Sequence, residues 1–462
     1  MEAPHAGRRV GTRRPVRQSV VVVLIALALR LVPVAFHRFH PERVLTLDSP
    51  LYLELGRNLR EHGAFRRTGP ERGAAVENPG AVEVFRTPGY PLLLALLGRT
   101  PQRVAVAAIC AQIVLDALAA GLIVGIAGTV MPRRWALIAG LLAAVDVGHI
   151  VYANLVMSDT VFAALLMAGV WLLVRPTEKR SFSSRLIAGL AFSAAAAVRP
   201  VGVMASVAGA VFLVARREDR RRIAVFLLAA LAFPVGWTFR NGMGAGVWSV
   251  SDAGGYNLCV VAGAKVKAAA EGITRSEAER RLVEQVLRES PGDDSARRSA
   301  AFRRVGWQVI SAHPSAAAKE AVVSLAEFAL AGERRYLLRL FGADTETSAG
   351  VDEGDRNPRA FLSGLARRER VELLVVLGQA GWNLLLWLAA FVGAVQLARR
   401  SRWAELLLFA TAIGYQTAAS FVVAHGRMRV PIVGMLAVMA ALGLSRVIRR
   451  RNVGDGQATT RV

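Results

Sequence analysis

Apolar residues in this chain are gathered into long blocks that are nearly free of charge, instead of recurring singly at helical or strand spacing. A helix needs about 20 such residues to cross the hydrocarbon core of a bilayer. The pattern predicts an all-α polytopic membrane protein with about ten transmembrane helices. We place these helices at residues 20–36, 104–130, 135–151, 156–174, 186–199, 201–215, 223–239, 372–397, 404–423 and 430–446.

Two long hydrophilic segments divide the apolar blocks. In the second of them, apolar and charged residues alternate at helical spacing over Ser276–Leu287, which predicts short amphipathic helices on the membrane surface. Within it, Gly342–Arg359 is crowded with Gly, Asp, Glu, Ser and Thr and is predicted to be a mobile loop. In chain order we expect a basic tail (1–19), seven helices (20–239) that include a hydrophilic loop (37–103), a hydrophilic segment (240–371), three helices (372–446) and a second tail (447–462).

The charge of the chain is distributed unevenly between these segments. The 462 residues include 58 lysines and arginines against 34 acids, a formal net charge of +24. Six segments on one side of the predicted helices together carry 24 basic residues against 5 acids: 1–19, 131–134, 175–185, 216–222, 398–402 and 446–462. Cytoplasmic loops carry such an excess, so we predict a multi-pass plasma-membrane protein with both ends in the cytoplasm and both hydrophilic segments outside. The charge is then an orientation signal, and nucleic acid is not an expected partner.

Further charged residues collect at the external ends of the predicted helices. Charged groups close to the hydrocarbon are costly and usually face a cavity or one another. Guanidinium groups also match phosphate oxygens in pairs. The sequence therefore predicts an external pocket for a lipid-linked phosphate, built from two carboxylates and several arginines: Asp48, Asp159, Arg86, Arg199, Arg240, Arg427 and Arg429.

These residues belong to short motifs that follow one another along the chain. In order the motifs are Asp48 with Tyr52, Arg86-Thr-Pro-Gly-Tyr-Pro91, Ser158-Asp159, Val198-Arg199-Pro200, Arg240-Asn241, Gly254-Gly255-Tyr256-Asn257, His313-Pro314 and Arg427-Met428-Arg429-Val430-Pro431. This order resembles the GT-C superfamily of integral-membrane glycosyltransferases. It is most similar to the family 39 branch, which contains protein mannosyltransferases and the lipid A aminoarabinose transferase. Two positions depart from the family pattern, since Met428 stands where an aromatic residue is common and Thr87 replaces a frequent proline.

The resemblance implies transfer of a sugar, expected to be a hexose, from a polyprenyl-phosphate donor to an external acceptor. The acceptor is expected to be a polysaccharide, a lipid or a protein, and the transfer is expected to invert the anomeric centre. Asp48 falls on the catalytic carboxylate of the family, and Asp159 falls on a second acidic position. We expect Arg199, Arg427 and Arg429 to bind the donor phosphate. Other expected pocket residues are Tyr52, Arg86, Tyr90, Arg240, Tyr256 and Asn257.

Simpler interpretations exist for the same residues. Asp48 and Asp159 both stand where helices are predicted to begin, so either could be only an N-cap. Arginines at helix ends commonly anchor a helix by reaching toward lipid headgroups. Arg30 and Asp116 lie deep in apolar blocks, which keeps a transporter or flippase open as the alternative function, although we expect Arg30 and Gln112 to form hydrogen bonds between helices.

Metal binding is not expected. Asp344 and Glu346 form a loose acidic pair, but no His or Cys cluster accompanies them, and acids are common throughout that loop. A solvated loop accounts for them better. We predict no cofactor and no stable metal site, with a loosely bound divalent cation left open.

Overall fold

The computed structural model of the chain describes residues 13–67, 82–176, 181–292, 294–342, 370–422 and 426–458. Asp344, Glu346 and nearly all of the loop expected at Gly342–Arg359 lie outside this part of the chain. The described residues are helical, with turns and one isolated β-bridge between Arg66 and Val82. The predicted all-α class is confirmed.

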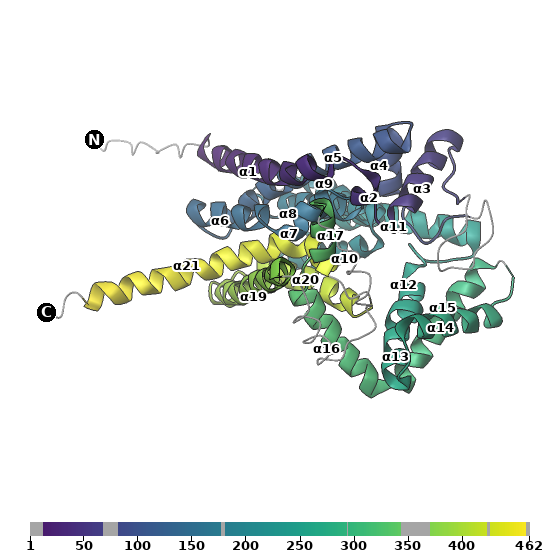
Figure 1. The fold of residues 1–462 in the computed structure, drawn as a ribbon. Coiled ribbons are helices and arrows are strands. Elements are labelled where there is room, and N and C mark those ends of the chain that lie inside the picture. Colours follow the sequence, from purple (N-terminus) through teal and green to yellow (C-terminus); the bar gives the residue numbers. More distant parts are fainter. Residues whose placement is uncertain are drawn as a thin grey trace.

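The apolar blocks form the long helices of the molecule (Figure 1). Each of the ten predicted transmembrane segments overlaps a helix or a bent pair of helices. These elements are α1 (Arg13–His37), α5 (Pro101–Ala127), α6 (Arg133–Ala144), α7 (Val147–Ala153), α8 (Asp159–Val174), α9 (Phe182–Val198), α10 (Val203–Ala215), α11 (Arg220–Ala245), α19 (Arg370–Arg399), α20 (Trp403–Val422) and α21 (Val433–Ala458).

Several of these elements differ in length. Three of the apolar helices have fewer than 18 residues: Asp159–Val174, Phe182–Val198 and Pro200–Ala215. A helix of 16 residues rises only about 24 Å, against about 30 Å for the bilayer core. Within the described residues, five helices are therefore long and apolar enough to cross a membrane, and the bent pair makes a sixth: Arg17–His37, Pro101–Ala127, Arg220–Ala245, Arg370–Arg399, Gly426–Ile448, and α6 with α7.

The predicted third transmembrane helix, 135–151, is not continuous. The helix is interrupted between α6 and α7, where the Asp146 carboxylate accepts a hydrogen bond from the backbone N–H of His149 at 3.1 Å. An aspartate that caps a new helix in this way favours an interruption over a straight continuation. The two helices consequently meet at 53°.

Helices α19 and α21 pack side by side at the C-terminal end of the chain. A Cβ atom on Gly393 would lie 1.9 Å from the carbonyl oxygen of Met439, and one on Gly443 would lie 2.1 Å from that of Ala389. Only glycine permits this approach of the two backbones, and such small residues are how helices associate closely in lipid.

The first part of the hydrophilic segment after α11, up to residue 312, forms a layer of helices at the end of the molecule away from the start of α1 and the end of α21, and the rest of the segment returns toward the long helices (Figure 1). We expected the apolar side of residues 276–287 to lie on the membrane. It packs instead on protein, because Leu282 and Val286 share a small buried core with Phe302 and Val305. The elements are α12 (Ala253–Tyr256), η2 (Asn257–Gly263), α13 (Ala264–Glu271), α14 (Arg275–Glu289), α15 (Ser295–Ala312), α16 (Pro314–Leu330) and α17 (Arg334–Leu340).

The hydrophilic loop after α1 forms α2 (Pro41–Val44), α3 (Ser49–His62) and α4 (Gly89–Leu97). Helix α3 packs tightly on α4 at Gly56, where a Cβ atom would lie 3.0 Å from the carbonyl oxygen of Pro91. Asp48 directly precedes α3, and Arg86 lies just before α4. The packing of these two helices thus brings the starts of α3 and α4, and with them Asp48 and Arg86, together.

The predicted orientation can be tested with reporters. A reporter fused after Arg451 is expected in the cytoplasm, and one inserted beside Gly272, an exposed residue between α13 and α14, is expected outside. The physical reason is the positive excess of the predicted cytoplasmic segments. Paired alkaline phosphatase and fluorescent-protein fusions measure this directly. Finding both reporters on one side would contradict the predicted topology.

Candidate active site

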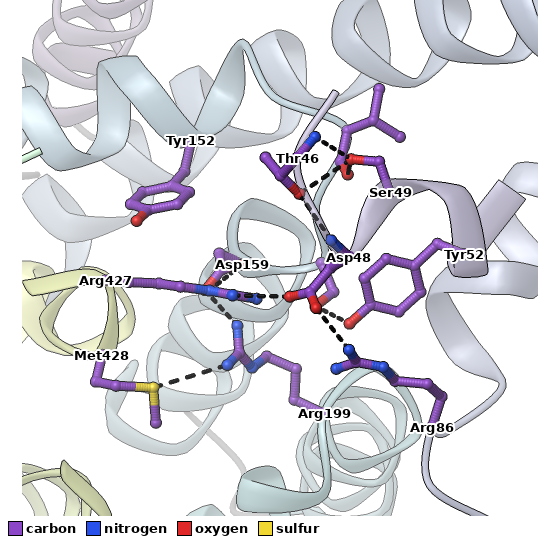
Figure 2. Close-up of polar contacts among 12 residues, drawn as sticks. Thr46, Asp48, Ser49, Tyr52, Arg86, Tyr152, Asp159, Arg199, Arg427 and Met428 are labelled. Carbon is purple, nitrogen blue, oxygen red and sulfur yellow. Dashed lines mark hydrogen bonds and ion pairs between the residues drawn. The ribbon is translucent and has the colours of Figure 1, made fainter. Parts of the chain in front are cut away.

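Asp48 lies in the turn between α2 and α3, and its side chain does not cap α3. The neighbouring Ser49 hydroxyl supports this turn instead. It accepts a hydrogen bond from the Thr46 N–H at 2.8 Å and donates one to the Val156 carbonyl at 2.8 Å. The interpretation of Asp48 as only an N-cap is therefore wrong, and its carboxylate is free to face other groups (Figure 2).

Two arginines from distant parts of the chain bind the Asp48 carboxylate. Arg86 donates to one oxygen at 2.6 Å, and Arg427 donates to the other at 2.9 Å. Arg427 belongs to the 3-10 helix η4 (Gly426–Ile432), far from Asp48 in sequence. Figure 2 shows both guanidinium groups pointing at this one carboxylate.

Asp159, the first residue of α8, forms the second half of the cluster. Its two carboxylate oxygens share the single Nε–H of Arg427, at 2.9 and 3.0 Å, and one of them also accepts a hydrogen bond from Arg199. It makes no capping hydrogen bond, because Ser158 occupies the N-cap position. Arg427 therefore bridges the two carboxylates, and a capping role alone does not describe Asp159.

The two carboxylates differ in their access to solvent. The side chain of Asp48 is 24% exposed and that of Asp159 is 1% exposed. The side chains of Arg86, Arg199 and Arg427 are partly exposed, at 16–21%. These three arginines do not reach outward as membrane anchors, because their guanidinium groups bind carboxylates. Three positive and two negative groups give this cluster a formal net charge of +1.

The pKa of Asp48 follows from these neighbours. Burial raises the pKa of the carboxyl, but the positive charges of Arg86 and Arg427 outweigh burial and hold the pKa well below its ordinary value of 3.8. The carboxylate is therefore ionised at neutral pH. Any anion that draws the two arginines away would return the pKa of Asp48 toward its ordinary range.

Aromatic side chains support Arg86. The guanidinium carbon lies 5.1 Å from the ring centre of Tyr52 and 5.0 Å from that of Phe85. The Tyr52 hydroxyl forms a 3.1 Å hydrogen bond with the Ser158 hydroxyl. Tyr90 is fully buried behind Tyr52 and donates to Gln112 at 2.7 Å. Of these expected pocket residues, Tyr52 supports the cluster directly, and Tyr90 supports Tyr52.

Arg429 does not join the cluster, although it was expected to bind phosphate together with Arg427. Its guanidinium donates to the carbonyl oxygens of Phe328, Ala329 and Ala331, at 2.7, 3.3 and 3.1 Å. These are the carbonyl groups at the end of α16, which a helix leaves without partners. Arg429 is only 3% exposed and thus ties η4 to α16.

Arg240 and the 254–257 motif lie beside the cluster without touching its carboxylates. Arg240 donates to the carbonyl oxygens of Glu83 and Phe65, at 2.6 and 3.1 Å, and stacks on Trp237 with 4.6 Å to the ring centre. Tyr256 packs edge-on against Phe85, and Asn257, the next residue, begins η2. Arg240 thus holds the backbone at Glu83 and Phe65, close to Arg86. Its guanidinium is already occupied by these carbonyl groups and does not add to the positive charge of the cluster.

Sequence reasoning missed Glu333, which lies between α16 and α17. It is 8% exposed and accepts a 2.7 Å hydrogen bond from the Tyr152 hydroxyl. Burial raises its pKa to about 7. Gly426, beside Arg427, packs against the same turn, since a Cβ atom there would lie 2.6 Å from the Ala331 carbonyl oxygen. No local pattern could reveal Glu333, because Tyr152 is 181 residues away.

The raised pKa of Glu333 predicts a pH-dependent stability. An acid whose pKa rises on folding binds its proton more tightly in the folded state, so stability falls as pH rises from 4.5 to about 7. The loss is up to about 3 kcal/mol. Unfolding in detergent at pH 5 and pH 8 measures it. We expect Glu333→Gln to remove this loss, and Glu284→Gln, at an exposed site, to retain it; equal pH dependence in both variants would contradict the assignment.

Arg30 and Asp116, the deep charged pair, bind each other and His149. Arg30 donates to Asp116 and to the carbonyl oxygen of Ala144, the latter at 2.8 Å, and His149 Nδ1 lies 2.6 Å from Asp116. Arg30, Asp116 and His149 are all nearly inaccessible to solvent. The expected interhelical hydrogen bonds are confirmed, and Gln112 makes others to Tyr90 and the carbonyl oxygen of Leu155.

In the part of the chain that the structure describes, no group of three or more His, Cys, Asp or Glu side chains is arranged to hold a metal ion. The cluster of Asp48 and Asp159 offers only two carboxylates, both already bound to arginine. The absence of a stable metal site remains a prediction.

Comparison with known proteins relates part of the chain to a known family. Residues 86–237 match the profile of a family described as dolichyl-phosphate-mannose-protein mannosyltransferase. This match includes Arg86, Asp159 and Arg199, and it precedes Arg427. A search of curated proteins finds no match to the sequence.

Solved structures of an oligosaccharyltransferase share the fold, and a further solved structure aligns with a lower score. The apo oligosaccharyltransferase of Archaeoglobus fulgidus is 13% identical, with a TM-score of 0.54, and the alignment covers 97% of this chain and 52% of that chain. AglB from the same organism, in complex with an inhibitory peptide and a dolichol-phosphate, is 12% identical, with a TM-score of 0.54 and coverage of 96% and 52%. ArnT from Cupriavidus metallidurans is 15% identical, with a TM-score of 0.38 and coverage of 91% and 77%.

The chain thus spans about half the length of the Archaeoglobus enzymes that it matches. The fold together with the family match confirms the resemblance to the GT-C superfamily. The chain is a multi-pass membrane protein with the fold of the Archaeoglobus oligosaccharyltransferases, and residues 86–237 are similar to the dolichyl-phosphate-mannose-protein mannosyltransferase family.

Proposed function

We propose that this protein is a glycosyltransferase that moves a sugar from a polyprenyl-phosphate donor to an acceptor at the external membrane surface. The observation that carries the proposal is the convergence of Arg86, Arg199 and Arg427 on Asp48 and Asp159. The net formal charge of +1 suits a phosphate group. The family description, which names mannose on dolichyl phosphate, favours a hexose.

The arginines would bind the phosphate of the donor. Each is partly exposed, and a guanidinium donates to phosphate oxygens in pairs. A phosphate that binds Arg86 and Arg427 competes with Asp48 for the same donors. Binding of the donor would therefore release the Asp48 carboxylate and raise its pKa at the moment when a base is needed.

Asp48 would act as the general base. As the acceptor oxygen forms a bond to the anomeric carbon, the Asp48 carboxylate takes the proton of the acceptor hydroxyl. The bond between the anomeric carbon and the phosphate oxygen breaks, and its electron pair leaves on the phosphate, where fixed guanidinium charges stabilise it. One displacement of this kind inverts the anomeric centre.

Asp159 would position Arg199 and Arg427 instead of taking part in proton transfer. Both of its oxygens are near Arg427 Nε, Arg199 also binds it, and its side chain is almost inaccessible. We therefore revise the catalytic role expected from the sequence to a positioning role. Asp48 remains the carboxylate that an acceptor can reach.

A transfer assay tests the proposal. Purified protein in lipid nanodiscs is incubated with radiolabelled polyprenyl-phosphate mannose or glucose and an extract of cell-envelope acceptors. We expect release of polyprenyl phosphate and labelling of a polysaccharide, lipid or protein. Movement of the intact donor across vesicles without sugar transfer would instead support the flippase alternative. Against that alternative, Arg30, Asp116 and His149 bind one another and are nearly inaccessible to solvent.

A further inference from the structure

A cavity of about 360 Å³ lies between α3, α4 and the first turn of α5, separate from the arginine–carboxylate cluster. Its walls are mainly apolar and include Leu53 of α3, Leu94 of α4 and Val104 of α5. None of the residues assigned above to phosphate binding or proton transfer lines it. The cavity therefore needs its own explanation.

The position of the cavity along α5 sets its depth in the membrane. Pro101 and Val104 line it and belong to the first turn of α5, one of the helices able to cross the bilayer. The first turn of such a helix lies at the level of the lipid headgroups. Next to it, α4 exposes Leu92 and Leu96, one turn apart, at 51% and 78%. The cavity thus adjoins a surface suited to lipid chains.

The charged residues of the cavity are mostly basic. Arg57, Arg60 and Arg99 line it together with one acid, Glu54, so its formal net charge is +2. Arg60 is held in place, since it donates to the carbonyl oxygens of Gly98 and Arg99. Arg57 and Arg99 are exposed, and no ion pair joins either one to an acid among the described residues. The start of α5 adds the positive end of a helix dipole.

We propose that this cavity binds the headgroup of an anionic phospholipid of the surrounding bilayer. Arg57 and Arg99 hold the phosphate, and the lipid chains lie along the exposed side of α4. Basic pockets beside transmembrane helices recognise anionic headgroups in this way, and guanidinium groups suit phosphate geometry. The proposal does not depend on the sugar-transfer reaction.

Native mass spectrometry of the full-length protein tests this site. Phosphatidylglycerol is titrated into protein prepared in a neutral detergent, and phosphatidylcholine serves as the neutral comparison. We expect saturable binding of at least one phosphatidylglycerol, weakened about tenfold or more by the double change Arg57→Gln and Arg99→Gln. Leu53→Trp fills the cavity without removing charge and should weaken binding as well.

A matched control separates a built site from general attraction to arginine. Arg133 and Arg134 are also exposed and also begin a membrane-associated helix, α6, but they do not line this cavity. Changing both to Gln should leave phosphatidylglycerol binding unchanged. Equal losses in the two double variants, or equal binding of phosphatidylcholine, would overturn the proposal. Retention of polyprenyl phosphate in place of phosphatidylglycerol would also overturn it, in favour of a carrier-lipid site.

Discussion

Replacing Asp48 with asparagine is expected to lower kcat by about two orders of magnitude or more, with expression and folding intact. Asparagine keeps the size of the side chain but cannot accept the proton of an acceptor hydroxyl. The turn before α3 should survive, because Ser49 and not Asp48 supports it through Thr46 and Val156. Sugar transfer and thermal unfolding of the same preparation measure the two effects separately.

Two further variants sharpen this result. Asp48→Glu should recover little, because an added methylene moves the carboxylate out of hydrogen-bond reach. Asp294 is a matched control, since it truly caps α15 and accepts from the N–H groups of Ala296 and Arg297 at 2.9 and 3.0 Å. Asp294→Asn should leave activity nearly normal. A fully active Asp48→Asn variant would exclude Asp48 as the base.

The depressed pKa of Asp48 adds a pH dependence. A carboxyl whose pKa is held below 3.8 is ionised throughout the neutral and mildly acidic range. The rate at low donor concentration should therefore show no decline due to Asp48 between about pH 5 and 8. This rate should decline through protonation of Asp48 only when the pH falls below the ordinary pKa of an aspartate, 3.8. A loss of kcat/KM centred near pH 6 that is absent from the residual activity of Asp48→Asn would contradict this.

The second large effect is expected at Arg427. Arg427→Leu removes the bridge between Asp48 and Asp159 and the proposed contact with the donor phosphate. We expect a loss of about 2–4 kcal/mol, or roughly 30- to 1000-fold in kcat/KM for the donor. Arg427→Lys should recover part of it, since lysine keeps the charge but lacks the planar fork that bridges two partners. Arg199→Leu should act in the same direction.

Arg429 provides the contrast, because it lies two residues away and binds the carbonyl oxygens at the end of α16. Arg429→Leu should lower the unfolding temperature while the protein that remains folded keeps its donor KM. Donor titrations at a temperature where both variants are folded distinguish the two arginines. A normal donor KM and kcat in Arg427→Leu, or a raised donor KM in Arg429→Leu, would overturn the assignment.

The sequence by itself determined the class of fold. Transmembrane helices such as α1, α5 and α21 are long apolar runs, and burial in lipid depends on local composition alone. The motif order also identified Asp48, Asp159, Arg199 and Arg427, four residues that the structure brings together. The pattern of apolar residues was less informative about whether a predicted helix is continuous. The interruption before α7 depends on a single capping contact of Asp146.

Only the tertiary structure decided which charged side chains meet. Arg427 and Arg429 look equivalent in the sequence, but in a 3-10 helix of three residues per turn, side chains two positions apart point in different directions. One therefore reaches the carboxylates, while the other reaches the end of α16. Glu333 with Tyr152, and His149 with Asp116, are likewise contacts between distant segments. Their partners are fixed by helix packing, and helix packing leaves no periodic trace in a single sequence.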